Sequence, residues 1–155
     1  MALGRFFQLL AFVLLCAFAG LFGSFVNYTA LDTWYPTLAK PSFTPPPALF
    51  GIVWAALYVM MGASAYLVFR EAGKKKGIRN ALYVFGGQLA LNALWSFLFF
   101  GLRSPLLGLV GIIALLFAVA FTIHKFYPIS RPAAWLLAPY LSWVCVAAVL
   151  NYYFW

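Results

Sequence analysis

The 155-residue chain has very few charged side chains and almost no acidic ones. Charged residues make up 8% of it, and Asp32 and Glu71 are the only acids. A soluble domain is about a quarter charged, so this chain cannot cover a soluble surface with charge. Two cysteines exclude a disulfide-rich secreted scaffold, and 12 glycines exclude a collagen repeat. A hydrophobic fraction of 66% excludes intrinsic disorder. What is left is an integral membrane protein.

Five apolar stretches are each long enough to cross a bilayer as a helix, which takes about 20 residues. They cover residues 6–26, 47–69, 80–101, 105–126 and 131–154. The alternation of polar and apolar residues that is typical of a membrane barrel is missing. We therefore predict an all-α fold, in which residues 1–155 form one membrane domain of five transmembrane helices.

The connection between the first two spans, residues 27–46, is much longer than the others. It contains Trp34, Tyr35 and four prolines. Long connections on a compact bundle are usually functional or disordered, and the aromatic and proline content favours order. We predict an ordered lid over one end of the bundle.

The basic residues divide unequally between the two ends of the predicted bundle. Eight lie in the N-terminus and the second and fourth connections, whereas only Lys40 and Arg103 lie in the long loop and the third connection. The positive-inside rule then predicts that the N-terminus is inside and that the first loop and the C-terminus are outside. Because the basic residues lie in short connections between spans rather than on one folded face, they do not indicate a nucleic-acid surface, and we expect no nucleic-acid partner.

Conventional catalytic and metal sites are excluded by the residue types present. His124 is the only histidine, and the two acids fall in connections on opposite sides of the membrane. A Ser-His-Asp triad, a pair of carboxylates and a multi-histidine metal site are therefore unavailable. We expect no metal and no bound cofactor. Cys16 and Cys145 lie inside apolar spans, and we expect both to be small buried side chains.

Three of the spans carry a stripe of aromatic and amide side chains along one helical face. The stripes are Trp54, Tyr58 and Met61; Gln88, Asn92 and Trp95; and Trp143, Ala147 and Asn151. Amides must face protein, water or a ligand, because exposing them to hydrocarbon is costly. At about 1.5 Å per residue, the stripes converge within roughly 10–18 Å of the long loop.

This layer of tryptophan and amide side chains has two interpretations. It can be a helical core held together by amide hydrogen bonds. Alternatively, it can be an apolar pocket whose indole faces stack on a flat aromatic ligand. None of its residues is a good axial ligand for haem iron, so a metal-free ring suits it better than haem.

The sequence of residues 34–46, WYPTLAKPSFTPP, resembles the WYxxLxKPxWxPP signature of the TspO/translocator protein family, which includes tryptophan-rich sensory proteins and peripheral-type benzodiazepine receptors. Further matches follow in the family's order at residues 54–62 (WAALYVMMG), 87–95 (GQLALNALW), 99–101 (FFG), 139–143 (PYLSW) and 150–152 (LNY). The resemblance extends over nearly the whole chain.

The resemblance implies a five-helix bundle, usually a homodimer, with the first loop closing a pocket. Family members bind porphyrins such as protoporphyrin IX and hydrophobic drug-like ligands, and some bind cholesterol. Bacterial members are linked to tetrapyrrole metabolism and stress responses. Some degrade protoporphyrin in light and oxygen through two tryptophans that match Trp54 and Trp143.

We accordingly expect a receptor, sensor or carrier of a bacterial membrane that binds porphyrins and hydrophobic drug-like ligands in a tryptophan-rich pocket under the first loop and regulates tetrapyrrole metabolism or a stress response. Light- and oxygen-dependent porphyrin degradation in the same pocket, or lipid and sterol transport, are the alternatives. The expected ligand-binding residues are Trp34, Tyr35, Pro41, Trp54, Tyr58, Gln88, Asn92, Trp95, Trp143, Ala147 and Asn151. Lys40 and Arg103 are expected to contact the propionates. Trp54 and Trp143 would be catalytic only if degradation occurs.

The chain departs from the family pattern at two places. Phe43 stands where the family signature has tryptophan. The proposed cholesterol motif needs a basic residue after its tyrosine, and none follows Tyr152, which argues against sterol recognition there.

For the homodimer, small residues predict a close-packing face on the first span (Cys16, Gly20 and Ser24, or Ala19 and Gly23) or on the third (Gly86 and Ala90). The resemblance favours the third span, because bacterial members of the family dimerise there.

Overall fold

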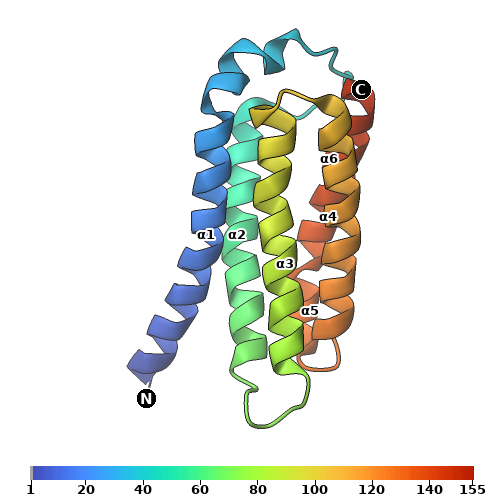
Figure 1. The fold of residues 1–155 in the computed structure, drawn as a ribbon. Coiled ribbons are helices and arrows are strands. Elements are labelled where there is room, and N and C mark those ends of the chain that lie inside the picture. Colours follow the sequence, from blue (N-terminus) through green and yellow to red (C-terminus); the bar gives the residue numbers. More distant parts are fainter. Residues whose placement is uncertain (1) are drawn as a thin grey trace.

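The computed structural model describes residues 2–155, and within that range it contains helices and short connections but no strand (Figure 1). The elements are α1 (Ala2–Thr33), η1 (Tyr35–Thr37), α2 (Pro47–Phe69), α3 (Ile78–Ser96), η2 (Phe97–Gly101), α4 (Pro105–Phe126), α5 (Arg131–Leu136) and α6 (Ala138–Phe154). Five helical segments are long and apolar enough to cross a membrane. The predicted all-α membrane fold is therefore confirmed.

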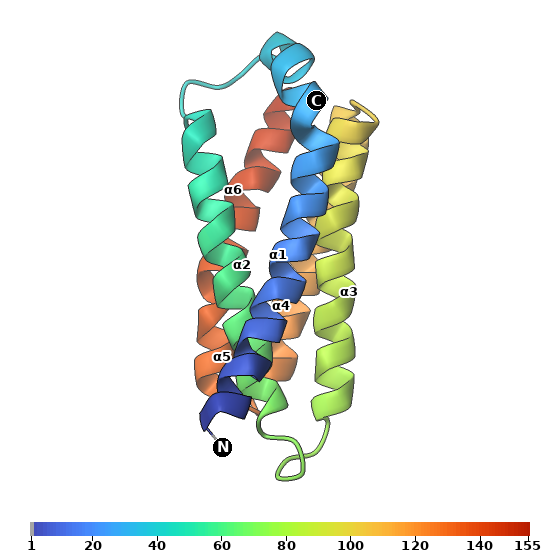
Figure 2. The same cartoon turned by 90° about the vertical axis from the view of Figure 1, so that its left-hand side faces the viewer.

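The first connection is shorter than predicted. The apolar pattern predicts that the loop begins at residue 27, whereas α1 continues to Thr33. Residues 27–33 contain neither proline nor glycine, so nothing in them stops a helix, and buried Ala30 packs into the core. The loop thus consists of residues 34–46. It crosses the end of the bundle from α1 to α2 (Figure 2).

The fifth predicted span is divided into α5 and α6 at Leu137. Pro139 lacks the N–H that would continue the helical hydrogen bonds, which accounts for the break.

Serine side chains cap the first turns of α4 and α5. Ser104 accepts a hydrogen bond from the Leu107 amide at 3.2 Å, and Ser130 accepts one from the Ala133 amide at 3.4 Å. Such caps satisfy amides that the helix itself leaves unpaired.

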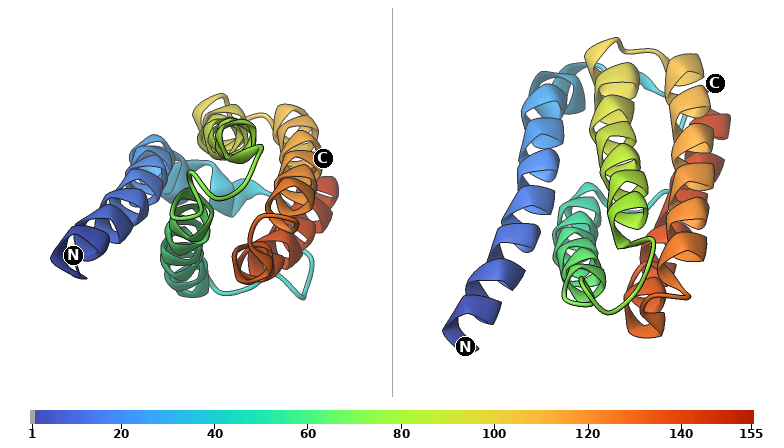
Figure 3. Two further views of the ribbon diagram at one scale, coloured as in Figure 1. Left: turned by 90° about the horizontal axis from the view of Figure 1, so that it is seen from below. Right: turned by 60° about the horizontal axis from the view of Figure 1, so that its bottom comes forward.

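The helices form one bundle, in which α1 packs on α2 and α4 lies between α3 and α6 (Figure 3). Gly62 permits the close approach of α1 and α2, because a Cβ atom there would lie 2.5 Å from the Val13 Cα. Cys16 is fully buried, as predicted. The prediction for Cys145 is wrong: it is exposed, because it lies two positions after Trp143 and so points to the outer face of α6.

The two ends of the bundle differ in charge. The N-terminus and the α2–α3 and α4–α5 connections lie at one end, and the residue 34–46 loop, the α3–α4 connection and the C-terminus lie at the other (Figure 1). We call the first the basic end and the second the loop end. Lys40 and Arg103 are the only lysine and arginine of the loop end.

Replacing Gly62 with alanine is expected to lower the free energy of unfolding by about 1–3 kcal/mol, because the Val13 backbone must move. Gly51→Ala is the matched control, since a Cβ atom at Gly51, the other glycine of α2, meets no atom within 4 Å. The measurement is thermal unfolding in detergent. Equal midpoints for the two variants would contradict the close α1–α2 contact.

Candidate functional site

Directly beneath the residue 34–46 loop, aromatic rings from α2, α3 and η2 stack on one another. The Trp54 and Trp95 rings lie 6.3 Å apart at an interplanar angle of 28°, and Trp95 lies 5.8 Å from Phe99 at only 7°. Phe100 meets Phe99 edge to face at 4.7 Å. We call Trp54, Trp95, Phe99 and Phe100 the aromatic cluster. Its near-parallel rings present flat apolar faces to one another.

The loop is held onto the aromatic cluster by its own aromatic side chains. Trp34 packs edge-on against Phe99 at 5.3 Å, and Tyr35 lies 5.8 Å from both Phe100 and Phe154. Burial raises the pKa of the Tyr35 phenol. The loop is therefore packed onto the bundle end, with Tyr35 between the third span and the end of α6.

A chain of hydrogen bonds joins α2, α3 and α6 just below the cluster. The Tyr58 hydroxyl donates to Asn92 Oδ1 at 2.7 Å, and Asn92 Nδ2 donates to the Tyr140 hydroxyl at 2.9 Å. Asn92 and Tyr140 are buried. A polar group in an apolar interior is costly unless it is paired, so these bonds set the mutual register of the three helices.

A second amide links the aromatic cluster itself to α6. The Trp95 indole N–H donates to Asn151 Oδ1 at 3.4 Å, and Asn151 Nδ2 donates to the Ala147 carbonyl at 2.8 Å. On α3, Gln88 Nε2 lies 3.9 Å from the Met61 sulfur, a weak hydrogen bond. The polar face of α3 thus points into the bundle rather than toward lipid.

Two buried polar atoms on these helices have no hydrogen-bond partner in the structure: Trp143 Nε1 and Gln88 Oε1. Trp143 packs against Phe50 of α2 at 5.4 Å, one turn of α6 beyond Tyr140. Buried donors and acceptors without partners are rare, so these two atoms are available to a further hydrogen-bonding group.

The two cations of the loop end are both engaged within the loop region. Lys40 Nζ donates to the Tyr35 carbonyl at 2.7 Å and lies 4.6 Å from the centre of the Tyr35 ring. Arg103 has a positive φ of 50° and approaches the Thr33 hydroxyl at 3.5 Å. Both side chains are exposed, so both are free to turn toward an anionic group at the rim.

The structure brings most of the expected ligand-binding residues together at the loop end. Pro41 is half-buried in the loop, where its carbonyl accepts hydrogen bonds from the backbone and side chain of Thr44. Trp143 is separated from the other two tryptophans of its layer, since it contacts Phe50 while Trp54 and Trp95 contact each other. Gln88 lies one turn deeper on α3 than Asn92.

Several aromatic residues that complete this region were not among the expected ligand-binding residues. They are Phe50, Phe99, Phe100, Tyr140 and Phe154. Helical spacing was a usable signal for three of them: Phe50 lies four positions before Trp54, Phe99 four positions after Trp95, and Tyr140 three before Trp143.

These observations define a class: a five-span membrane protein whose ordered loop covers a cluster of stacked rings and paired amides. Comparison with known proteins then gives the family. The model described as the TspO/MBR family matches residues 12–155. The chain is 44% identical over 145 residues to the tryptophan-rich protein TspO of Archaeoglobus fulgidus, covering 94% of this chain and 93% of that protein.

Two further relatives agree with this assignment. The tryptophan-rich protein TspO of Chlorobaculum tepidum is 41% identical over 138 residues, which is 89% of this chain and 87% of that one. The translocator protein of Homo sapiens is 42% identical over 125 residues, which is 79% of this chain and 73% of that one. The chain belongs to the TspO/MBR family, as its sequence motifs predicted.

Replacing Tyr58 with phenylalanine is expected to lower the free energy of unfolding by about 1–2 kcal/mol, because Asn92 Oδ1 loses its donor. Tyr152→Phe is the matched control: it removes the same hydroxyl from a side chain that is 62% exposed. Unfolding of both variants in detergent checks the prediction. If the two variants are equally stable, the Tyr58–Asn92–Tyr140 chain does not support the bundle.

Proposed function

We propose that this protein is a membrane receptor, acting as a sensor or carrier, that binds protoporphyrin IX-like tetrapyrroles and other flat hydrophobic molecules beneath the loop. The observation that carries the proposal is the near-parallel stack of Trp54, Trp95 and Phe99 under the loop. When a flat ring system inserts between two of these side chains, each of them stacks on the ligand instead of on its neighbour. Binding therefore loses little of the stacking energy that the free protein already has.

Polar groups around the stack support an oriented ligand. Trp143 Nε1 is buried without a partner and can donate to a polar atom of the ligand. Lys40 and Arg103 are exposed beside the loop and can pair with the propionates of a porphyrin whose ring is buried. Such an orientation places the apolar macrocycle in the bundle and its carboxylates at the aqueous rim. Regulation of tetrapyrrole metabolism or of a stress response is the role we assign to such a receptor, from its family.

Charge and surface shape support a particular orientation and assembly. We place the basic end inside and the loop end outside, since the basic end carries most of the lysine and arginine. We place the homodimer contact on α3, because Gly86, Gly87 and Ala90 are exposed there and a Cβ atom at either glycine meets nothing within 4 Å. The small residues of α1 are already used within one chain: Cys16 is buried and Gly20 faces the Tyr58 ring.

Light- and oxygen-dependent porphyrin degradation is the second candidate function. The observation that favours it is that Trp54 and Trp143 both lie close to Tyr140. The Tyr140 ring lies 6.2 Å from the Trp54 ring, and Tyr140 lies one turn of α6 from Trp143. A porphyrin bound beside Tyr140 would therefore have both indoles nearby. A porphyrin excited by light takes an electron from a neighbouring indole and passes it to molecular oxygen, which becomes superoxide. The indole radical regains an electron from the macrocycle, and the oxidised macrocycle combines with the superoxide, so that oxygen is the net oxidant and the indole is restored. This activity would use the same residues as binding, without acid–base chemistry.

Titration with protoporphyrin IX in detergent is expected to quench tryptophan fluorescence saturably. Trp54→Phe and Trp143→Phe should each weaken binding about threefold to tenfold, because Trp54→Phe reduces the stacking area and Trp143→Phe removes the indole N–H that donates to the ligand. Trp135→Phe is the matched control, since Trp135 is 67% exposed at the basic end. Equal weakening by all three variants, or no saturation in the unsubstituted protein, would contradict the proposed site.

The same samples separate binding from degradation. After binding, illumination in air should leave the porphyrin absorbance stable if the protein is only a receptor. Bleaching that needs light and oxygen, and that is lost in Trp54→Phe and Trp143→Phe more completely than binding is, would assign the second function.

Replacing Lys40 and Arg103 together with glutamine is expected to weaken protoporphyrin binding about twofold to fivefold and to flatten its dependence on salt. The salt dependence separates charge pairing from loosening of the loop, because losing the Lys40–Tyr35 bond alone would change affinity without changing that slope. Lys76→Gln/Arg79→Gln at the basic end removes equal charge as a control. An unchanged salt slope would exclude these residues as propionate contacts.

A further inference from the structure

The basic end carries a concentration of charge that the protein itself does not neutralise. Two connections and the helix ends beside them supply seven basic side chains, namely Arg70, Lys74, Lys75, Lys76, Arg79, Lys125 and Arg131. Glu71 is the one acid of this end, and it lies 3.8 Å from Arg70. The excess positive charge repels itself and attracts anions from outside the chain.

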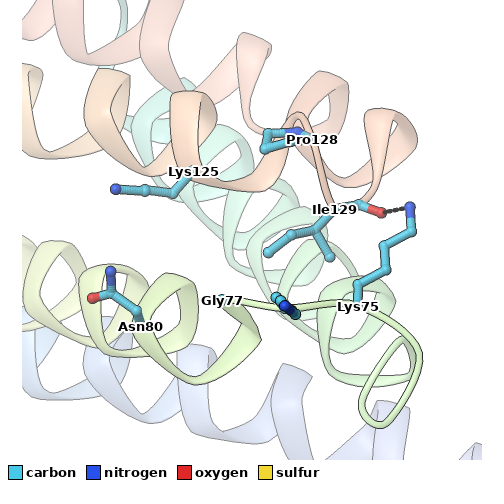
Figure 4. A pocket seen from close by; sticks show the side chains of 7 residues that line it. Lys75, Gly77, Asn80, Lys125, Pro128 and Ile129 are labelled. Atoms are coloured by element: carbon cyan, nitrogen blue, oxygen red, sulfur yellow. Dashed lines mark hydrogen bonds between the residues drawn. The ribbon is translucent and has the colours of Figure 1, made fainter.

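This charge surrounds two hollows that share one wall. Lys75 of the α2–α3 connection donates to the Ile129 carbonyl of the α4–α5 connection at 2.5 Å (Figure 4), and both of these residues line both hollows. The first has a volume of about 350 Å³, and the second has a volume of about 760 Å³. Glu71 lines only the second hollow, with Arg70 and Arg131.

The first hollow is lined by donors and holds no carboxylate. Lys76, Asn80 and Lys125 line it together with the Lys75–Ile129 wall. Figure 4 shows Asn80 on α3 and Lys125 on α4 on opposite walls. Lys125 is half-buried, so its charge is less screened by water than that of a fully exposed lysine. Ammonium and amide N–H groups arranged in this way suit a phosphate group.

The depth of the hollow indicates which phosphate it would meet. It lies where α3 begins, at Ile78, and where α4 ends, at Phe126, which is the level at which spans leave the hydrocarbon. Tyr127 and Trp135, which are 46% and 67% exposed, lie at the same end. Exposed tyrosine and tryptophan are typical of the headgroup layer of a membrane. A lipid phosphate is therefore present at this depth at far higher concentration than a soluble one.

We propose that the hollow lined by Lys75, Lys76, Asn80 and Lys125 binds the phosphate of an anionic phospholipid. The bound headgroup ties the α2–α3 connection to the end of α4. This site lies at the opposite end of the bundle from the aromatic cluster, so lipid binding here does not depend on porphyrin binding.

Native mass spectrometry of the full chain, with phosphatidylglycerol and phosphatidylcholine in competition, tests the proposal. The first bound lipid is expected to be phosphatidylglycerol, with a preference of about tenfold from the charges lining the site. Lys76→Gln/Lys125→Gln should reduce the preference to about twofold or less, since both charges line the hollow. The matched control is Arg5→Gln/Lys74→Gln, which removes the same charge from this end at residues outside the lining.

Three outcomes would overturn the proposal. An equal loss of preference in the control variant would mean that the general positive field, rather than this site, selects the lipid. No preference in the unsubstituted protein would mean that there is no headgroup site. Loss of the first phosphatidylglycerol when inorganic phosphate is added in large excess would assign the site to a soluble phosphate. Circular dichroism and thermal unfolding of each variant establish that it is folded.

Discussion

The pairing of amide and phenol groups within an apolar bundle is the constraint on which the loop end depends. Hydrocarbon offers no alternative partner, so Asn92 must meet Tyr58 and Tyr140 at hydrogen-bond distance. These bonds set how α2, α3 and α6 face one another. The Trp54–Trp95 stack lies one turn further toward the loop, and the Trp95–Asn151 bond ties it to α6 as well.

The loop and the aromatic cluster depend on each other. Trp34 and Tyr35 pack on Phe99 and Phe100, which belong to the π-helical end of the third span. A π-helical turn is often found at functional sites, and here it presents two consecutive phenylalanines to the interior. Because the same rings hold the loop and form the proposed binding surface, a ligand that enters the cluster must also displace loop contacts. Binding and loop ordering are therefore coupled in this account.

Periodicity within single helices predicted much of this structure. The five spans followed from their apolar length, and the spacing of Gln88, Asn92 and Trp95 correctly placed all three on one face, which is buried. The position of Trp143 beside Phe50 could not be predicted in this way. It depends on how far α2 and α6 are shifted relative to each other along the bundle, and the spacing of residues within one helix does not determine that shift. The end of α1 was missed because a polar stretch can continue a helix when nothing breaks it.

The function that we propose requires a flat ligand to occupy the aromatic cluster beneath the loop. The most direct measurement is an experimental structure of the protein in a lipid environment with protoporphyrin IX bound. The macrocycle is expected to contact Trp54 and Trp95, with its propionates toward Lys40 and Arg103. A porphyrin bound on the lipid-facing surface, with the Trp54–Trp95 stack undisturbed, would contradict the proposed function.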